Sequence, residues 1–195
     1  MRTLSSALLV VFALPLAAQS VTWGVTGGAT LGSPEDLYSL AAVSSIGGWT
    51  AGVTIGPRVP TSALDFRIDV SYSNLGNHAG KVLDPFPVDP EWYDARFVTA
   101  GASADLVWNV LGAGKSTSPY LLAGLGWYAA QTTTTDFFRT TTLTSGVLSY
   151  NGGLGFRFTR YFIEARAIVY RDVLQPYGAS RANIYSYPVT LGLWF

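Results

Sequence analysis

The sequence has no cysteine and contains a single histidine and a single methionine. Without cysteine, the chain forms no disulfide bond and offers neither a thiolate metal ligand nor a cysteine nucleophile. Charged residues are also scarce, because they make up 12% of the chain, whereas an ordinary soluble domain has about 25%. The twelve basic residues balance the twelve acidic ones, so no basic field is present to hold nucleic acid. We therefore expect no nucleic-acid partner.

The chain also lacks an apolar run long enough for a transmembrane helix. The candidate over residues 4–14 is well short of the ~20 residues that cross a bilayer. It follows Met-Arg-Thr and precedes the small residues Ala17 and Ala18, which is the order of a secretory signal. We predict a signal peptide over residues 1–18, cleaved within about two residues of Ala18, and a single domain over residues 19–195.

What the domain does contain is alternation of apolar and polar residues. In residues 64–73 every even position is apolar and every odd position is polar, which is typical of a strand with two unlike faces. Similar segments recur along the chain, and we count eight of them: residues 21–31, 49–56, 64–73, 98–108, 121–129, 150–158, 163–169 and 187–195. Most are close to the ~9 to 11 residues of a tilted membrane strand. We predict an all-β fold, an eight-stranded antiparallel up-and-down transmembrane β-barrel.

The connections between these strands alternate in length. Short links cover residues 57–62, 109–119 and 159–160, and long links cover residues 32–48, 74–93, 132–145 and 171–184. Short turns at one end and long loops at the other indicate periplasmic turns and extracellular loops. Because threonine favours strands, the threonine runs 132–135 and 140–142 predict strands that extend past the membrane.

The alternative to a membrane barrel is a secreted soluble barrel or sandwich, which has the same period. In that case the aromatic face of every strand would point inward, yet an eight-stranded barrel has room only for modest side chains. We therefore place the aromatic face of each strand against lipid, in the outer membrane, and the face that carries glycine, serine and threonine inside the barrel. Two aromatic girdles are predicted at the headgroup levels: a periplasmic one of Trp23, Trp108, Phe158, Tyr161 and Phe195, and an outer one of Trp49, Tyr72 and Tyr187. Trp127 is mid-strand and fits neither.

Charged residues with inward parity form the other candidate feature. Four acidic and three basic residues have this inward parity: Asp65, Arg67, Asp69, Asp105, Arg157, Glu164 and Arg166. They predict a plug of paired charges rather than an ion path, because open channels belong to barrels of about 16 strands. If residues 159 and 160 close a two-residue hairpin, Arg157 reaches Glu164 as a diagonal neighbour.

Three patterns resemble chemical sites but lack the required spacing. The segment Gly114-Lys115-Ser116-Thr117 lacks the first glycine of a phosphate-binding loop, because position 109 is Asn109. Lipid A deacylases carry a histidine and a serine two residues apart on one strand, and the lone His78 has no serine at that spacing. The acidic residues Asp84, Asp89, Glu91 and Asp94 match no calcium loop. We predict no catalytic, cofactor or metal site.

The last strand carries the most specific resemblance. Its alternate residues are apolar or aromatic and end on a terminal phenylalanine: Tyr187, Val189, Leu191, Leu193 and Phe195. Through this strand and the segments 120–128 and 162–166, the chain resembles the small outer-membrane barrels of the OmpA and OmpX type over the whole predicted domain. The sequence has no counterpart of the peptidoglycan-binding domain of full-length OmpA. The resemblance implies that the outer-membrane barrel insertion machinery reads the last strand.

These observations predict a monomeric, non-enzymatic outer-membrane protein, with membrane lipids and the insertion machinery as partners. Its barrel would serve as a scaffold for four extracellular loops, because loops carry recognition. The alternatives are a narrow channel for small or apolar solutes and, with less support, a lipid-modifying enzyme.

Overall fold

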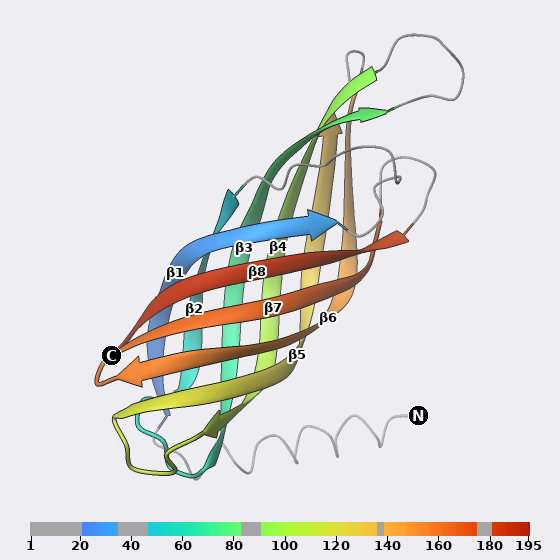
Figure 1. The fold of residues 1–195 in the computed structure, drawn as a ribbon. Coiled ribbons are helices and arrows are strands. Elements are labelled where there is room, and N and C mark those ends of the chain that lie inside the picture. The colour runs from blue at the N-terminus through green and yellow to red at the C-terminus, as the bar shows by residue number, and fades with distance from the viewer. Residues whose placement is uncertain (1–20, 35–46, 83–90, 136–138, 175–180) are drawn as a thin grey trace, which may run out of the picture.

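The computed structural model describes residues 21–34, 47–82, 91–135, 139–174 and 181–195. They form eight strands: β1 (Val21–Pro34), β2 (Gly47–Pro57), β3 (Leu64–Val82), β4 (Glu91–Asn109), β5 (Thr117–Thr135), β6 (Thr140–Phe158), β7 (Tyr161–Leu174) and β8 (Arg181–Trp194). Each strand pairs antiparallel with its neighbours in sequence, and β8 pairs with β1, so the sheet closes (Figure 1). The predicted eight-stranded up-and-down barrel is confirmed. The predicted signal peptide lies outside the described residues.

Among the residues that the model describes, no helix is long and apolar enough to span a membrane.

The alternation read from the sequence separates an outer face from an inner one. On β5 the exposed and covered positions alternate over nearly all of its nineteen residues. Leu125 and Trp127 point outward and are 61% and 64% exposed, whereas Tyr120, Leu122 and Tyr128 are buried inside the barrel. Large apolar side chains exposed on every strand are what a barrel surrounded by lipid requires.

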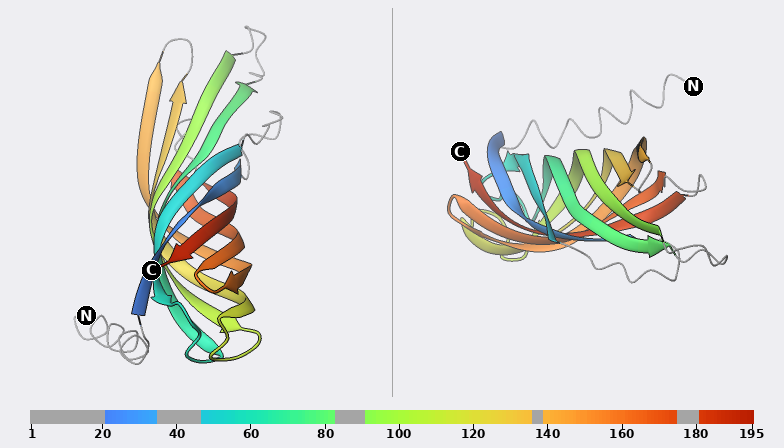
Figure 2. Two further views of the ribbon diagram at one scale, coloured as in Figure 1. Left: turned by 90° about the vertical axis from the view of Figure 1, so that its left-hand side faces the viewer. Right: turned by 90° about the horizontal axis from the view of Figure 1, so that it is seen from above.

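Four strands are longer than a membrane crossing needs. β3, β4, β5 and β6 have nineteen residues each, about twice the ~9 to 11 that span a bilayer. Their ladders continue to Val82↔Glu91 and Thr135↔Thr140, and Figure 2 shows them rising past the other strands. The strand extension expected at the threonine runs is confirmed. The long links 74–93 and 132–145 were predicted too long, because polar strand residues were taken for loop.

The short turns are tied to one another at the opposite end. The amide of Gly114 donates to the carbonyl of Pro60, and the amide of Thr159 donates to that of Ser116, each at 2.8 Å. Gly114 has a φ of 76°, a value that glycine adopts at little cost. The segment that resembles a phosphate-binding loop is therefore part of a turn whose glycine amide is already bonded.

The ladder between β7 and β8 is interrupted in the middle of the two strands. Pairing runs from Tyr161↔Leu193 to Ala165↔Val189 and resumes at Ile168↔Ser186. Pro188 lies within this gap, and proline has no N–H to give to a ladder. The seam between β7 and β8 is therefore weakened next to Arg166.

The interior is filled by more than small residues. An apolar cluster fills the extracellular half: Leu75, Phe97, Tyr128, Ala130, Val147, Ile168, Tyr170, Val173 and Ile184. A smaller cluster of Val107, Tyr120 and Leu122 lies toward the periplasmic end. The sequence predicts only modest side chains in the lumen besides the charged residues, which is wrong, because glycines on the inward face make room for rings. A Cβ on Gly155 or Gly192 would collide with the ring of Tyr120 or Phe162.

Candidate functional site

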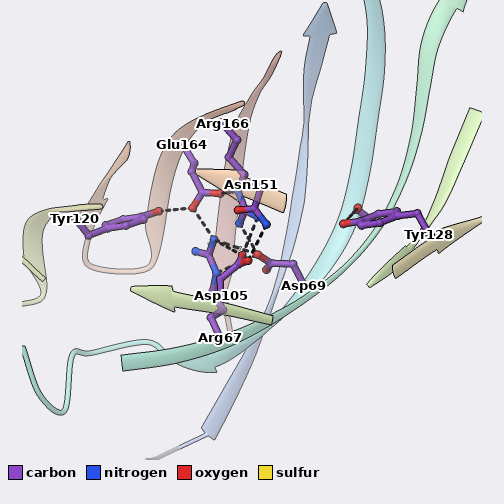
Figure 3. A network of polar contacts seen from close by, with 9 residues as sticks. Arg67, Asp69, Asp105, Tyr120, Tyr128, Asn151, Glu164 and Arg166 are labelled. Atoms are coloured by element: carbon purple, nitrogen blue, oxygen red, sulfur yellow. Dashed lines mark hydrogen bonds and ion pairs between the residues drawn. The ribbon is translucent and has the colours of Figure 1, made fainter. Parts of the chain in front are cut away.

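Five charged residues meet in the middle of the lumen, between the two apolar layers. We call Arg67, Asp69, Asp105, Glu164 and Arg166 the lumen network (Figure 3). The Nη2 atom of Arg67 lies 2.8 Å from Glu164 Oε2, 3.1 Å from Asp69 Oδ2 and 3.8 Å from Asp105 Oδ2. The side chains of Arg67 and Glu164 are 2% exposed and that of Asp105 is 0% exposed, so these bonds form away from bulk water.

Arg166 is the second cation of the lumen network and bonds the same three acids. Its Nη1 atom donates to Asp105 Oδ2 at 2.8 Å, and its other nitrogens donate to Asp69 and Glu164. Arg67 and Asp69 belong to β3, whereas Glu164 and Arg166 belong to β7. In a closed order of eight strands, β3 and β7 are four strands apart in either direction. The ion pairs therefore join opposite walls of the barrel.

Two uncharged residues add hydrogen bonds to the lumen network. The hydroxyl of Tyr120 donates to Glu164 Oε2 at 2.8 Å, and the amide of Asn151 donates to Asp105 Oδ1 at 3.0 Å. Neither residue was among the sequence candidates. Both have inward parity, so a search for polar side chains of any kind on that parity would have found them.

The structure places Asp65 and Arg157 on the inner face but outside the lumen network. Asp65 accepts hydrogen bonds from Asn109 and Thr61, each at 2.8 Å, and thus ties strand ends and turns together. Arg157 lies over the ring of Tyr120, with its Cζ 5.4 Å from the ring centroid. Its buried Nε and Nη1 atoms have no hydrogen-bond partner.

The predicted contact between Arg157 and Glu164 is therefore wrong. The hairpin register on which it rested is present, because Phe158 faces Tyr161 and Arg157 faces Phe162. Tyr120 instead occupies the bonding position beside Glu164 and presents its ring to Arg157. Glu164 pairs with Arg67 across the lumen, which a neighbour rule within one hairpin does not detect.

The charges of the lumen network are paired with each other inside the barrel. Its three carboxylates and two guanidinium groups bond each other, and apolar layers lie on both sides of it. Buried charges are tolerated when they are paired and hydrogen-bonded. Among the described residues, no group of three or more histidine, cysteine or acidic side chains is arranged to hold a metal ion.

The eight predicted girdle residues all lie on the outer face and are 38–53% exposed: Trp23, Trp49, Tyr72, Trp108, Phe158, Tyr161, Tyr187 and Phe195. Several form pairs between strands, with ring centroids 4.4 Å apart for Trp23 and Phe195 and 5.3 Å apart for Trp49 and Tyr72. Such pairs add to the stability that area burial alone provides. Trp127, which fitted neither girdle, is outward as well and leans over Gly146.

The last strand presents the alternate residues of the predicted assembly signal to the outside. Tyr187, Val189, Leu191 and Phe195 are exposed, and Leu193 is half-buried. The amide of Phe195 donates to the carbonyl of Trp23 at 2.9 Å, so the terminal residue is attached to β1. Its reading by the insertion machinery stays a prediction.

Some sequence candidates lie outside the part of the chain that the structure describes. Asp84 and Asp89 lie outside the described residues, and the side chains of His78, Glu91 and Asp94 lie outside them as well.

Comparison with known proteins identifies the family. The model of the outer membrane protein beta-barrel domain matches residues 3–165, and no curated protein matches the chain. Neisserial surface protein A is similar in structure, with a TM-score of 0.52, 14% identity, and coverage of 91% of this chain and 100% of that one. Ail, the attachment invasion locus protein of Yersinia pestis, has a TM-score of 0.50 and 13% identity, covering 89% and 98%.

A more distant likeness is to the outer membrane enzyme PagL, with a TM-score of 0.43 and 16% identity over 89% of this chain and 99% of that one. At these identities the likenesses show the fold alone. The family match covers most of the chain, and the closed barrel agrees with it. The chain belongs to the outer membrane protein beta-barrel family and is located in the outer membrane.

Proposed function

We propose that this protein is a non-enzymatic surface protein whose sealed barrel anchors a binding surface outside the membrane. The observation that carries the proposal is the length of β3 to β6, whose paired strands extend about twice as far as a bilayer crossing requires. Residues 75–82, 91–97, 131–135 and 140–148 form the part that we call the extracellular sheet. A barrel that only sealed a membrane would not need it.

The outer side of the extracellular sheet is suited to polar contacts. Thr135, Thr140 and Thr142 are exposed, and their hydroxyls form the cross-strand pairs Thr133–Thr142 and Thr135–Thr140, each at 3.2 Å. Paired hydroxyls fix the side chains while each oxygen keeps capacity for a further hydrogen bond. Such a preordered surface lowers the entropy cost of binding a partner.

The channel alternative has less support. An aqueous path would cross the extracellular apolar cluster, whose members are 0–8% exposed, and then the lumen network. The enzyme alternative rests on no described constellation of nucleophile and base. We therefore assign specificity to the outside of the barrel and not to the lumen.

A photo-crosslinking experiment tests the proposal. A crosslinking amino acid at position 142, on the extracellular sheet, should give adducts with soluble proteins or glycans when cells are exposed to their natural surroundings. The matched control places the same probe at Ala123, which faces lipid on β5 and should give lipid adducts only.

The two alternatives make opposite predictions. Large, steady single-channel currents from the purified wild-type protein in planar bilayers would support the channel and contradict our proposal. A protein-dependent change in the mass spectrum of lipid A would support the enzyme. Equal adducts at positions 142 and 123 would remove the evidence for an extracellular binding surface.

A further inference from the structure

Charges are distributed unevenly between the two faces of the barrel. Asp65, Asp69, Asp105 and Glu164 lie in the lumen, whereas the outward face of the described strands carries no charge along its lipid-facing band. At the extracellular edge of this band, three exposed arginines follow: Arg96 on β4, Arg171 on β7 and Arg181 on β8. An outer surface whose first charges are cations is suited to anionic headgroups.

Arg171 and Arg181 are neighbours on adjacent strands. The register pairs Tyr170 with Ile184 and Leu174 with Arg181. Asn183 therefore stands opposite residues 171 and 172, and Arg181 is the next residue of the same face. Diagonal neighbours of this kind have Cα atoms about 7 to 8 Å apart. Two long side chains at that separation can reach a single ligand. Arg96 is three strands away from β7 and has no second exposed arginine on the described parts of the neighbouring strands.

A β-bulge directly follows Arg171, which itself continues the outward parity of Val169. The ladder shifts between Tyr170 and Val173, both of which are buried inside the barrel. The extra residue, Asp172, has a φ of 56°, which costs energy for any residue other than glycine. Bulges re-aim side chains at functional positions. Here the bulge returns Val173 to the lumen and leaves Arg171 exposed on the outside.

The pair also lies at the height where headgroups are expected. On β7, Arg171 follows the outward residue Val169, and on β8 the outward row runs from Tyr187 of the outer girdle to Arg181. Aromatic side chains mark the interface between hydrocarbon and headgroups. Arginine is well suited to phosphate because its planar group can donate two parallel hydrogen bonds.

We propose that Arg171 and Arg181 together bind a phosphate group of a lipid in the outer leaflet. The inference is independent of the proposed function, because it concerns the outer wall of β7 and β8 and not the extracellular sheet. Asp172 is the only described acidic side chain that is exposed, and its negative charge opposes the binding.

The test uses the folded protein in nanodiscs of phosphatidylcholine that contain graded fractions of diphosphorylated lipid A, with retained lipid A counted by native mass spectrometry. The double variant Arg171→Gln, Arg181→Gln should bind lipid A about tenfold more weakly or worse, because two charge-assisted contacts are lost. Arg96→Gln, the matched control at a lone arginine, should lose about twofold at most. Asp172→Asn should bind at least as tightly as the wild type, since asparagine tolerates the same backbone conformation.

Several results would overturn the inference. They are unchanged binding by the double variant, equal binding of lipid A stripped of its phosphates, and a loss in Arg96→Gln as large as in the double variant. Displacement of lipid A by millimolar inorganic phosphate would assign the site to free phosphate instead. Heat-dependent gel mobility verifies that each variant is folded. If the double variant does not fold, the two single variants are compared, and each should lose affinity more than Arg96→Gln does.

Discussion

Arg67 and Arg157 offer a direct measurement of what the lumen network contributes to stability. Both side chains are arginines on the inner face and both residues are 2% exposed. Arg67 bonds Glu164 and Asp69 at 2.8 and 3.1 Å, whereas the described residues offer Arg157 no ion pair and leave two of its nitrogens without partners. Replacing each arginine by methionine removes a similar volume but very different electrostatics.

The expected cost follows from the bonds lost. Arg67→Met leaves Arg166 as the single arginine bonded to the three carboxylates of the lumen network. Glu164 Oε2 then keeps the hydroxyl of Tyr120 as its partner. Two charged hydrogen bonds at about 1.5 to 3 kcal/mol each agree with the roughly 3 to 5 kcal/mol that breaking a buried pair costs. Arg157→Met should change the free energy of unfolding by less than about 1 kcal/mol, because no bonded anion is left behind.

Urea titration in lipid vesicles, followed by tryptophan fluorescence, measures both variants against the wild type. The slope of the free energy of unfolding against urea concentration should be the same in all variants, so that the shift in midpoint reports the change in stability. The double variant Arg67→Met, Glu164→Gln should recover part of the loss, because it also removes a stranded carboxylate. Equal costs for the two methionine variants, or a cost below about 1 kcal/mol for Arg67→Met, would refute the view that pairing in the lumen sets stability.

Three further predictions concern single positions. Thr159 has a φ of 54° in the turn between β6 and β7, so Thr159→Gly should raise the free energy of unfolding by about 1 kcal/mol in the same urea assay. Gly155→Ala should lower it by about 1 to 3 kcal/mol because the added methyl meets the ring of Tyr120, and combining it with Tyr120→Leu should cost less than the sum. Deleting Phe195 should reduce the yield of inserted barrel in cells far more than the yield of refolding in detergent, and an equal loss in both would argue against a targeting role.

The alternation of residues was sufficient to predict most of the fold. Apolar and charged residues alternate along β3, with Leu64, Ile68 and Val70 on one face and Asp65 and Arg67 on the other. This alternation predicts the strand and both of its faces, because the side-chain period of a strand is two. The strand ends were harder to predict. In residues 131–135 both faces of the strand are polar, so this segment does not differ from a loop in its pattern, although it is paired.

For the candidate site, the sequence predicts which face of the sheet each charged residue lies on, but not which residue it bonds. Parity places Arg67 and Glu164 inside the barrel, yet it does not say which inward residues meet across the lumen. These two are 97 positions apart, and they meet only because the sheet closes. Parity also misjudged the space, since an inward glycine such as Gly155 can either leave a gap or accommodate the ring of Tyr120.

The placement of the ion pairs between β3 and β7 has a mechanical consequence. A thin cylinder whose wall is one sheet thick resists stretching along its hydrogen bonds, but it ovalises easily under lateral pressure. The contacts of Arg67 with Glu164 and of Arg166 with Asp69 run along a diameter, so any change toward an oval section must lengthen or compress them. They brace the tube next to Pro188, where the wall lacks a ladder bond. The cross-section of this barrel is therefore fixed from within, by a strut between opposite walls, as well as by the circumference of its sheet.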